Sequence, residues 1–140
     1  MPFELDPVLN ADTLEVASLA LCEARLMNDA RFPWLILVPR REGAVEILDL
    51  APGDQDLLWT EIRLAARALR TTYHPDKLNI GALGNQVAQL HVHVIARFRS
   101  DEAWPAPVWG SGRARRYGRE RDERLGELKI MLAKAAPAVG

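Results

Sequence analysis

Cysteine is almost absent from this sequence of 140 residues, because Cys22 is the only one. A single thiol excludes an internal disulfide and any zinc site that needs several cysteines. Long apolar runs are also missing, since no stretch approaches the roughly 20 residues of a transmembrane helix. The acidic N-terminal stretch lacks the cationic start of a secretion signal. We therefore expect a cytoplasmic protein that has no membrane partner.

Net charge is small as well, because 18 basic residues face 19 acidic ones and leave a formal charge of −1. A protein that coats nucleic acid would be strongly basic, so we expect no specific nucleic-acid partner. The length fits one domain with a single core, and we assign residues 1–112 to it. Residues 113–140 begin with an excess of arginine. They are expected to be a basic extension of the same domain, either a solvated helix face or a lid that contacts phosphate.

Hydrophobic periodicity predicts several short strands around one long helix. The predicted strands cover 22–27, 34–38, 78–80 and 88–98. The first two strands are separated by a short polar turn, so they should form a hairpin. The first dozen residues contain Pro2 and Pro7 and show little periodicity, so we expect an irregular start. Residues 13–21 are ambiguous between a strand and a helical turn.

Two helices are expected. The longer one begins at Pro52, which suits the first position of a helix, and its apolar residues recur at helical spacing up to Leu69. The second begins near residue 119, carries leucines at helical spacing and should stop before Pro137.

Two histidines lie two residues apart in the most regular predicted strand. Because side chains alternate across a strand, Gln89, His91 and His93 should share one face, and the apolar residues between them should face the core. An imidazole can attack phosphorus, accept a proton or bind a metal. Two surface histidines without a function are the plainer alternative. Metal binding lacks an evident third ligand, since His74 falls in a distant loop.

A polar glycine-containing loop leads directly into this strand. It contains Gly84, Asn85 and Gln86. Such a loop can present backbone N–H groups and amide side chains to an anion. A glycine loop followed by a histidine strand is therefore a stronger indication of an anion-binding site than either feature alone.

The segment Gly84-Asn-Gln-Val-Ala-Gln-Leu-His-Val-His-Val-Ile95 resembles the histidine triad (HIT) superfamily of nucleotide hydrolases and transferases. The family pattern is His-φ-His-φ-His-φ-φ, where φ is apolar, preceded by a polar glycine loop. Asn28 and the strand Leu35-Ile-Leu-Val-Pro39 also resemble the first hairpin of the family. The resemblance covers roughly residues 20–98. It implies an α+β fold with about five antiparallel strands, one long helix and a C-terminal helix, and it implies a homodimer.

The resemblance also implies roles for individual residues. His91 corresponds to the middle histidine, which attacks an α-phosphate and forms a nucleotidyl-histidine that water hydrolyses. His93 is the third histidine, and Gln89 stands where the first belongs. Asn28 would bind the ribose. The histidine of the first hairpin is replaced by Trp34, or by Glu42 if the alignment shifts.

We therefore expect an enzyme that hydrolyses or transfers a small nucleotide conjugate without a cofactor. The expected catalytic residues are His91, His93 and Gln89. The expected substrate-binding residues are Asn28, Gly84, Asn85 and Gln86. Two other functions stay open: a nucleotide-binding module with little turnover, and a metal-binding protein that uses the two histidines.

Overall fold

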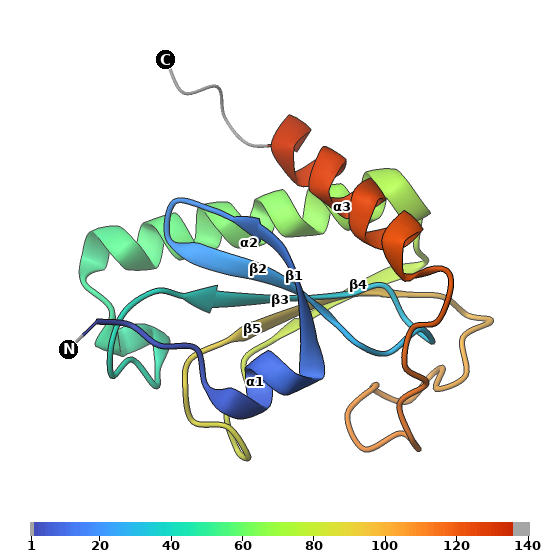
Figure 1. Ribbon diagram of the computed structural model, residues 1–140, viewed down its shortest axis with the longest axis horizontal. Coiled ribbons are helices and arrows are strands. Elements are labelled where there is room, and N and C mark those ends of the chain that lie inside the picture. The colour runs from blue at the N-terminus through green and yellow to red at the C-terminus, as the bar shows by residue number, and fades with distance from the viewer. Residues whose placement is uncertain (1, 136–140) are drawn as a thin grey trace.

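The computed structural model describes residues 2–135 (Figure 1). Its strands are β1 (Thr13–Ser18), β2 (Cys22–Met27), β3 (Trp34–Pro39), β4 (Lys77–Gly81) and β5 (Val92–Arg97). Its helices are α1 (Pro7–Asp12), the short 3-10 helix η1 (Ile47–Asp49), α2 (Pro52–Tyr73) and α3 (Arg121–Ala135).

The five strands form one sheet in the order β1-β2-β3-β5-β4, and every neighbouring pair is antiparallel. This confirms the expected α+β fold with a five-stranded antiparallel sheet, one long helix and a C-terminal helix. The ambiguous segment before Cys22 is a strand, and the expected hairpin is the pair β2 and β3.

The two faces of the sheet are covered differently (Figure 1). Alternate residues of β3 and β5, such as Leu35, Leu37 and Val94, form the main core with α2 and α3. The other face carries a smaller apolar cluster that includes Trp34 and Ile95. Loops and α1 cover this second face only in part. A functional site can therefore open here without breaching the main core.

A carboxylate fastens α2 to the turn between β1 and β2. Glu61 is buried on α2, and its two oxygens accept hydrogen bonds from the backbone amides of Leu21 and Cys22 over 2.9 and 2.8 Å. These bonds satisfy two backbone donors that would otherwise be buried without partners. Burial, with the nearby Glu61 charge, raises the pKa of the Cys22 thiol, so this residue serves as a small core side chain.

Several predicted boundaries were wrong. The first dozen residues are not irregular throughout, because α1 begins at Pro7 and the Asp6 side chain accepts a hydrogen bond from Val8 N. The strand expected over 88–98 is shorter and covers only Val92–Arg97. The neighbouring strand β4 ends at Gly81, opposite His93, so the residues before Val92 have no partner in β4. Helix α3 begins at Arg121, close to the expected start near residue 119, and Pro137 lies outside the described residues.

Within residues 2–135, no helix has both the length and the apolar character needed to cross a membrane.

Candidate functional site

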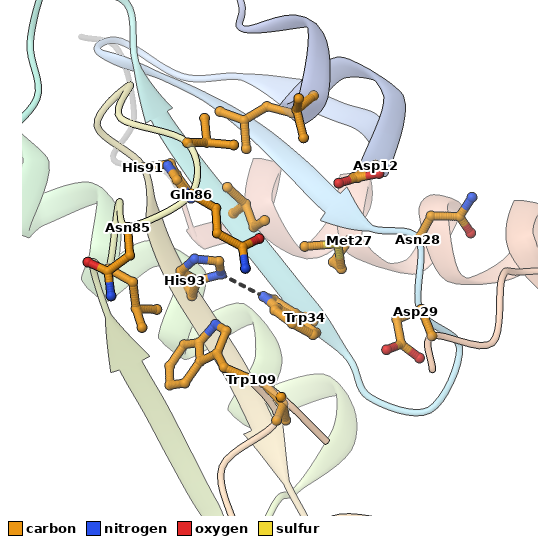
Figure 2. Close-up of a pocket in the computed structure, with 18 of the residues that line it drawn as sticks. Asp12, Met27, Asn28, Asp29, Trp34, Asn85, Gln86, His91, His93 and Trp109 are labelled. Atoms are coloured by element: carbon orange, nitrogen blue, oxygen red, sulfur yellow. Dashed lines mark hydrogen bonds between the residues drawn. The ribbon is translucent and has the colours of Figure 1, made fainter. Parts of the chain in front are cut away.

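A pocket of about 440 Å³ opens on the less covered face of the sheet (Figure 2). Its walls come from α1, from the tip of the β2–β3 hairpin, from the loop before β5 and from the segment after residue 107. Six of the seven site residues expected from the sequence line it: Asn28, Gly84, Asn85, Gln86, His91 and His93. The structure thus brings together two histidines and a polar loop that are close in the sequence, and it adds Asn28 from the distant first hairpin.

His91 lies just before β5 and is held by the backbone. Its Nδ1 lies 2.7 Å from the carbonyl oxygen of Gln89. A carbonyl can only accept, so this contact assigns the proton to Nδ1 and leaves a lone pair on Nε2. The ring is buried except for its edge in the pocket, with 7% of the residue exposed. This tautomer is the one that a nucleophilic imidazole requires.

His93 is held in the opposite tautomer. The indole Nε1–H of Trp34 donates to His93 Nδ1 over 3.0 Å, so the proton of the neutral imidazole must sit on Nε2 (Figure 2). Burial, reinforced by the neighbouring His91, lowers the pKa of His93 to about 3. At neutral pH this side chain is therefore an uncharged hydrogen-bond donor. The two imidazoles lie with ring centroids 4.9 Å apart.

A second indole lies against His93. The Trp109 and His93 rings meet edge to face with centroids 5.3 Å apart, and Trp109 also lines the pocket. The Trp109 Nε1 is buried and has no hydrogen-bond partner. Gly81 lies beside this indole, and a Cβ there would be in ordinary van der Waals contact with the ring at 3.4 Å. Sequence reasoning missed Trp109, since its loop carries no periodic signal that ties it to the histidine strand.

The polar loop before β5 forms the wall nearest the histidines. Gly84 has a positive φ of 71°, a conformation that glycine adopts without strain. The Gln86 side chain points into the pocket on the side where His91 and His93 lie (Figure 2). The loop can therefore offer amide donors to an anion held beside the two imidazoles.

Asn28 lies at the far end of the pocket, where the arginine-rich segment crosses the hairpin. We call residues 113–120 the basic strap. The backbone amide of Tyr117 donates to Asn28 Oδ1 over 2.8 Å, and Ala30 N donates to the carbonyl of Arg115 over 2.6 Å. Arg116 of the strap lines the pocket and lies 4.0 Å from the carboxylate of Asp12. The strap is irregular rather than helical and forms part of the pocket wall.

Asp29 fixes the turn beside Asn28. Its buried carboxylate accepts hydrogen bonds from the Arg31 guanidinium and from the backbone amides of Arg31 and Arg115. Burial acts to raise the pKa of this carboxyl, but these hydrogen bonds outweigh it and hold the pKa below its ordinary value. Asp29 is therefore ionised at neutral pH and serves as an anchor for the hairpin tip.

Gln89 is not where the sequence predicts it. Its Oε1 accepts from Asp6 N over 2.8 Å, and its Nε2 donates to the carbonyl of Glu4 over 2.8 Å. The side chain thus lies in a separate hollow of about 250 Å³, together with Glu42. The expected shared face with His91 and His93 was wrong, because regular strand geometry begins only at Val92. Of the two candidates for the missing hairpin histidine, Trp34 is the one that contacts the site.

Within residues 2–135, no three His, Cys, Asp or Glu side chains are arranged so that they could hold a metal ion. His74, the remaining histidine, ends α2 with a left-handed backbone conformation.

The chain is similar to three solved histidine triad proteins over nearly its whole length. It is 44% identical to one from Bradyrhizobium japonicum, with a TM-score of 0.92 and coverage of 94% of this chain and 99% of that one. For one from Sinorhizobium meliloti 1021 the identity is 46%, the TM-score 0.87 and the coverage 96% and 97%. For one from Marinobacter aquaeolei VT8 the identity is 39% and the TM-score 0.93, and the match covers 97% of this chain and 100% of that one. No curated protein matches the chain.

The HIT domain family model matches residues 9–100, which include the hairpin, α2 and the histidine strand. The basic strap and α3 lie beyond this match, although the three histidine triad structures extend over them. The chain therefore belongs to the HIT domain family, whose members are nucleotide-binding hydrolases or transferases.

Proposed function

We propose that this HIT domain protein is an enzyme that cleaves a small nucleotide conjugate at its α-phosphate, with His91 as the nucleophile. The observation that carries the proposal is the contact between His91 Nδ1 and the Gln89 carbonyl. It leaves Nε2 as the ring nitrogen available to a substrate, in a pocket that also holds hydrogen-bond donors. Nucleophilic catalysis requires that combination of a free lone pair and a fixed ring.

The reaction would proceed in two steps. His91 Nε2 attacks the α-phosphorus, a bond from nitrogen to phosphorus forms, and the bond to the leaving group breaks with its electron pair. In the resulting nucleotidyl-imidazolium, the Nδ1–H still donates to the Gln89 carbonyl, which stabilises the positive charge of the ring. Water, or another acceptor hydroxyl in a transferase, then attacks the phosphorus and gives up its proton to solvent. The bond from phosphorus to nitrogen breaks, and its electron pair returns to Nε2.

Three groups would stabilise the phosphoryl oxygens during both steps. His93 offers its Nε2–H, because Trp34 occupies the other ring nitrogen. Gln86 and Asn85 offer side-chain amides from the loop that contains Gly84. Donors aimed at developing negative charge contribute about 10²–10³-fold each in related kinds of site.

The other end of the pocket would hold the nucleoside. Asn28 would hydrogen-bond the ribose, in keeping with the family resemblance of the first hairpin. Leu9, Met27 and Ile36 line the pocket and offer apolar surface for a base.

Gln89 would act as a positioning residue. Its carbonyl orients His91, while its side chain fastens residues 4–6 in front of α1. Because α1 lines the pocket, one residue would connect the nucleophile with a wall of the nucleotide site. In this proposal the glutamine replaces the first triad histidine without donating to the phosphate itself.

The test is the turnover and labelling of His91→Ala. Adenosine and guanosine 5′-conjugates labelled at the α-phosphorus would be screened: dinucleoside polyphosphates, phosphoramidates, acyl nucleotides and sugar nucleotides. Quenched wild-type reactions should contain labelled protein with an acid-labile bond at His91. His91→Ala should lose turnover by several orders of magnitude and keep affinity for AMP or GMP in calorimetry, since a nucleophile contributes mainly to the chemical step.

His74→Asn is the matched control, because it alters a histidine outside the pocket and asparagine tolerates its left-handed backbone. Wild-type turnover in His91→Ala would refute the proposal. Tight binding of AMP or GMP without turnover of any conjugate would favour the nucleotide-binding module. One equivalent of metal by elemental analysis, lost on changing His91 or His93, would favour the metal-binding protein.

A further inference from the structure

We propose that the site cleaves anhydrides, in which the leaving group departs from the α-phosphorus as an oxyanion, and that it discriminates against nucleotides joined to an amine or an alcohol. This inference rests on the proposed function, because it assumes attack by His91. The structural feature that carries it is the hydrogen bond from Trp34 to His93.

Trp34 prevents His93 from acting as a general acid. An imidazole that protonates a leaving group must first carry protons on both nitrogens. In His93 the Nδ1 already accepts the indole N–H of Trp34, so a proton added there would face another donor across 3.0 Å. Trp34 is itself buried and fixed in β3, so it cannot swing away without opening the apolar cluster around it.

Trp109, which contacts a different part of the His93 ring, also disfavours a positive charge on His93. Figure 2 shows its indole nitrogen on the side that faces His93, and the rings lie nearly perpendicular at 80°. An indole N–H is the positive edge of the ring, and it interacts well with a neutral π-system but poorly with an imidazolium. Two indoles thus hold His93 as an uncharged donor.

The other titratable side chains that line the pocket do not replace this acid. They are Asp12, Asp29, Arg31, Arg116 and His91. Asp29 is held ionised by Arg31, and a guanidinium does not release its proton in the neutral range. Asp12 is paired with Arg116 and lies near Asn28 rather than beside His93 (Figure 2). The proton of His91 is engaged by the Gln89 carbonyl.

A pocket that has no general acid discriminates among leaving groups by their basicity. When the bond from phosphorus to an amine or alkoxide breaks, the electron pair stays on a strongly basic atom that needs a proton as it departs. General acid catalysis of such a departure contributes about 10²–10⁴-fold. A phosphate or carboxylate leaving group departs with the electron pair as a stable anion. Cleavage of an anhydride is therefore not slowed by the lack of a general acid. Phosphoric and acyl-phosphoric anhydrides share this chemistry.

The experiment compares one nucleoside 5′-phosphoryl group joined to four leaving groups: a nucleotide, acetate, propylamine and propanol. Wild-type kcat/KM should favour the two anhydrides over the amide and the ester by at least about 10²-fold. The nucleotide and acetate arms then show which anhydride is preferred. Trp34→Phe removes the indole donor, so the ratio of anhydride to amide turnover should fall by about tenfold or more. Trp59→Phe, an exposed tryptophan on α2, is the matched control and should leave the ratio unchanged.

A second measurement does not depend on the variants. Nitrogen NMR of the wild-type imidazoles should show His93 protonated on Nε2 and neutral down to pH 5. A His93 that gains a second proton near pH 6.5, or amide turnover equal to anhydride turnover, would overturn the inference. Equal labelling of His91 by amide and anhydride would leave the nucleophile in place and refute only the leaving-group selection. No labelling by any substrate would refute the proposed function as well.

Discussion

Tyr117 and Asn28 are joined by a hydrogen bond of 2.8 Å, in which the backbone amide of Tyr117 donates to the side-chain oxygen of Asn28. This bond fastens the basic strap to the residue that we assign to the ribose. The Asn28 side chain therefore binds Tyr117 through its oxygen, and its amide nitrogen is left to bind the proposed ribose.

Asn28→Ala should weaken substrate binding and loosen the strap. Loss of one hydrogen bond costs about 1 kcal/mol, so KM should rise by about 5–10-fold while kcat changes little. Trypsin should cut more rapidly at Arg115 or Arg116, which can be followed by mass spectrometry. Asn28→Asp keeps an oxygen acceptor for Tyr117, so it should restore protection from trypsin but not KM. An unchanged cleavage rate in Asn28→Ala would contradict the tie between strap and hairpin.

Gln89→Ala should affect the N-terminal segment more than the chemical step. Alanine keeps the carbonyl that orients His91, so kcat should fall by less than about tenfold, below the loss expected for a direct phosphate donor. KM should rise, because residues 4–6 lose both hydrogen bonds that hold them in front of α1.

A deletion of residues 2–6 supplies the control for Gln89→Ala. The deletion also removes the Asp6 cap of α1, so KM should rise further than in Gln89→Ala. In the deleted protein, however, Gln89→Ala should have no additional effect on KM, and a double-mutant cycle measures this coupling. Gln89→Glu places a carboxylate against the Glu4 carbonyl and should resemble Gln89→Ala. If Gln89→Ala instead slows the chemical step by about 10²-fold or more and leaves KM unchanged, the side chain donates directly to the phosphate.

His93 should make the folding stability depend on pH below neutrality. Its pKa is lowered from 6.5 to about 3 in the folded protein, chiefly by burial. As the pH falls, the unfolded chain binds the proton first. The stability is therefore full above about pH 6.5 and is lost towards pH 3, by up to about 1.4 kcal/mol per pH unit. Urea denaturation at pH 7, 6 and 5 measures this slope.

His93→Gln removes the titrating group, so its unfolding free energy should fall less steeply over the same pH range. His74→Asn should keep the wild-type slope. Parallel curves for wild type and His93→Gln would mean that His93 titrates normally in the folded protein.

A homodimer is expected from the family resemblance. The isolated sheet has two edge strands, β1 and β4, and open edges favour association or protection. Light scattering at micromolar concentrations should give twice the chain mass of 15.6 kDa. A mass of one chain throughout that range would contradict the expectation.

Much of the fold could be predicted because β3 is a continuous apolar run, while apolar residues alternate around the histidines before and in β5 and recur at helical spacing in α2. The short helix α1 has no comparable pattern, since six residues allow fewer than two turns, and its stability comes from the Asp6 cap and from packing of Leu9. The alternating pattern also predicted a histidine strand that is too long. The pattern contains no information about where the neighbouring strand β4 ends.

Part of the candidate site could be predicted for a different reason. His91, His93 and the preceding loop are neighbours in sequence, so their proximity needs little tertiary information. Trp34 and Trp109 contact His93 from two other segments, and only the folded chain brings them together. For Gln89 the local pattern gave the wrong result. Alternation placed its side chain on the face of the histidines, but its hydrogen bonds with residues 4–6 hold it elsewhere.

The pairing of β5 with its two neighbours has a consequence for how the site can fail. His93 lies opposite Ile36 of β3 and opposite Gly81 of β4, while Val92 and Val94 on either side face the main core. A slip of β5 by one residue would bury His93 beneath α2 and turn a valine towards Trp34. Such a slip would bury polar atoms and expose apolar ones along the whole strand. The free energy that selects the correct strand register therefore also fixes the face of the sheet on which His93 lies.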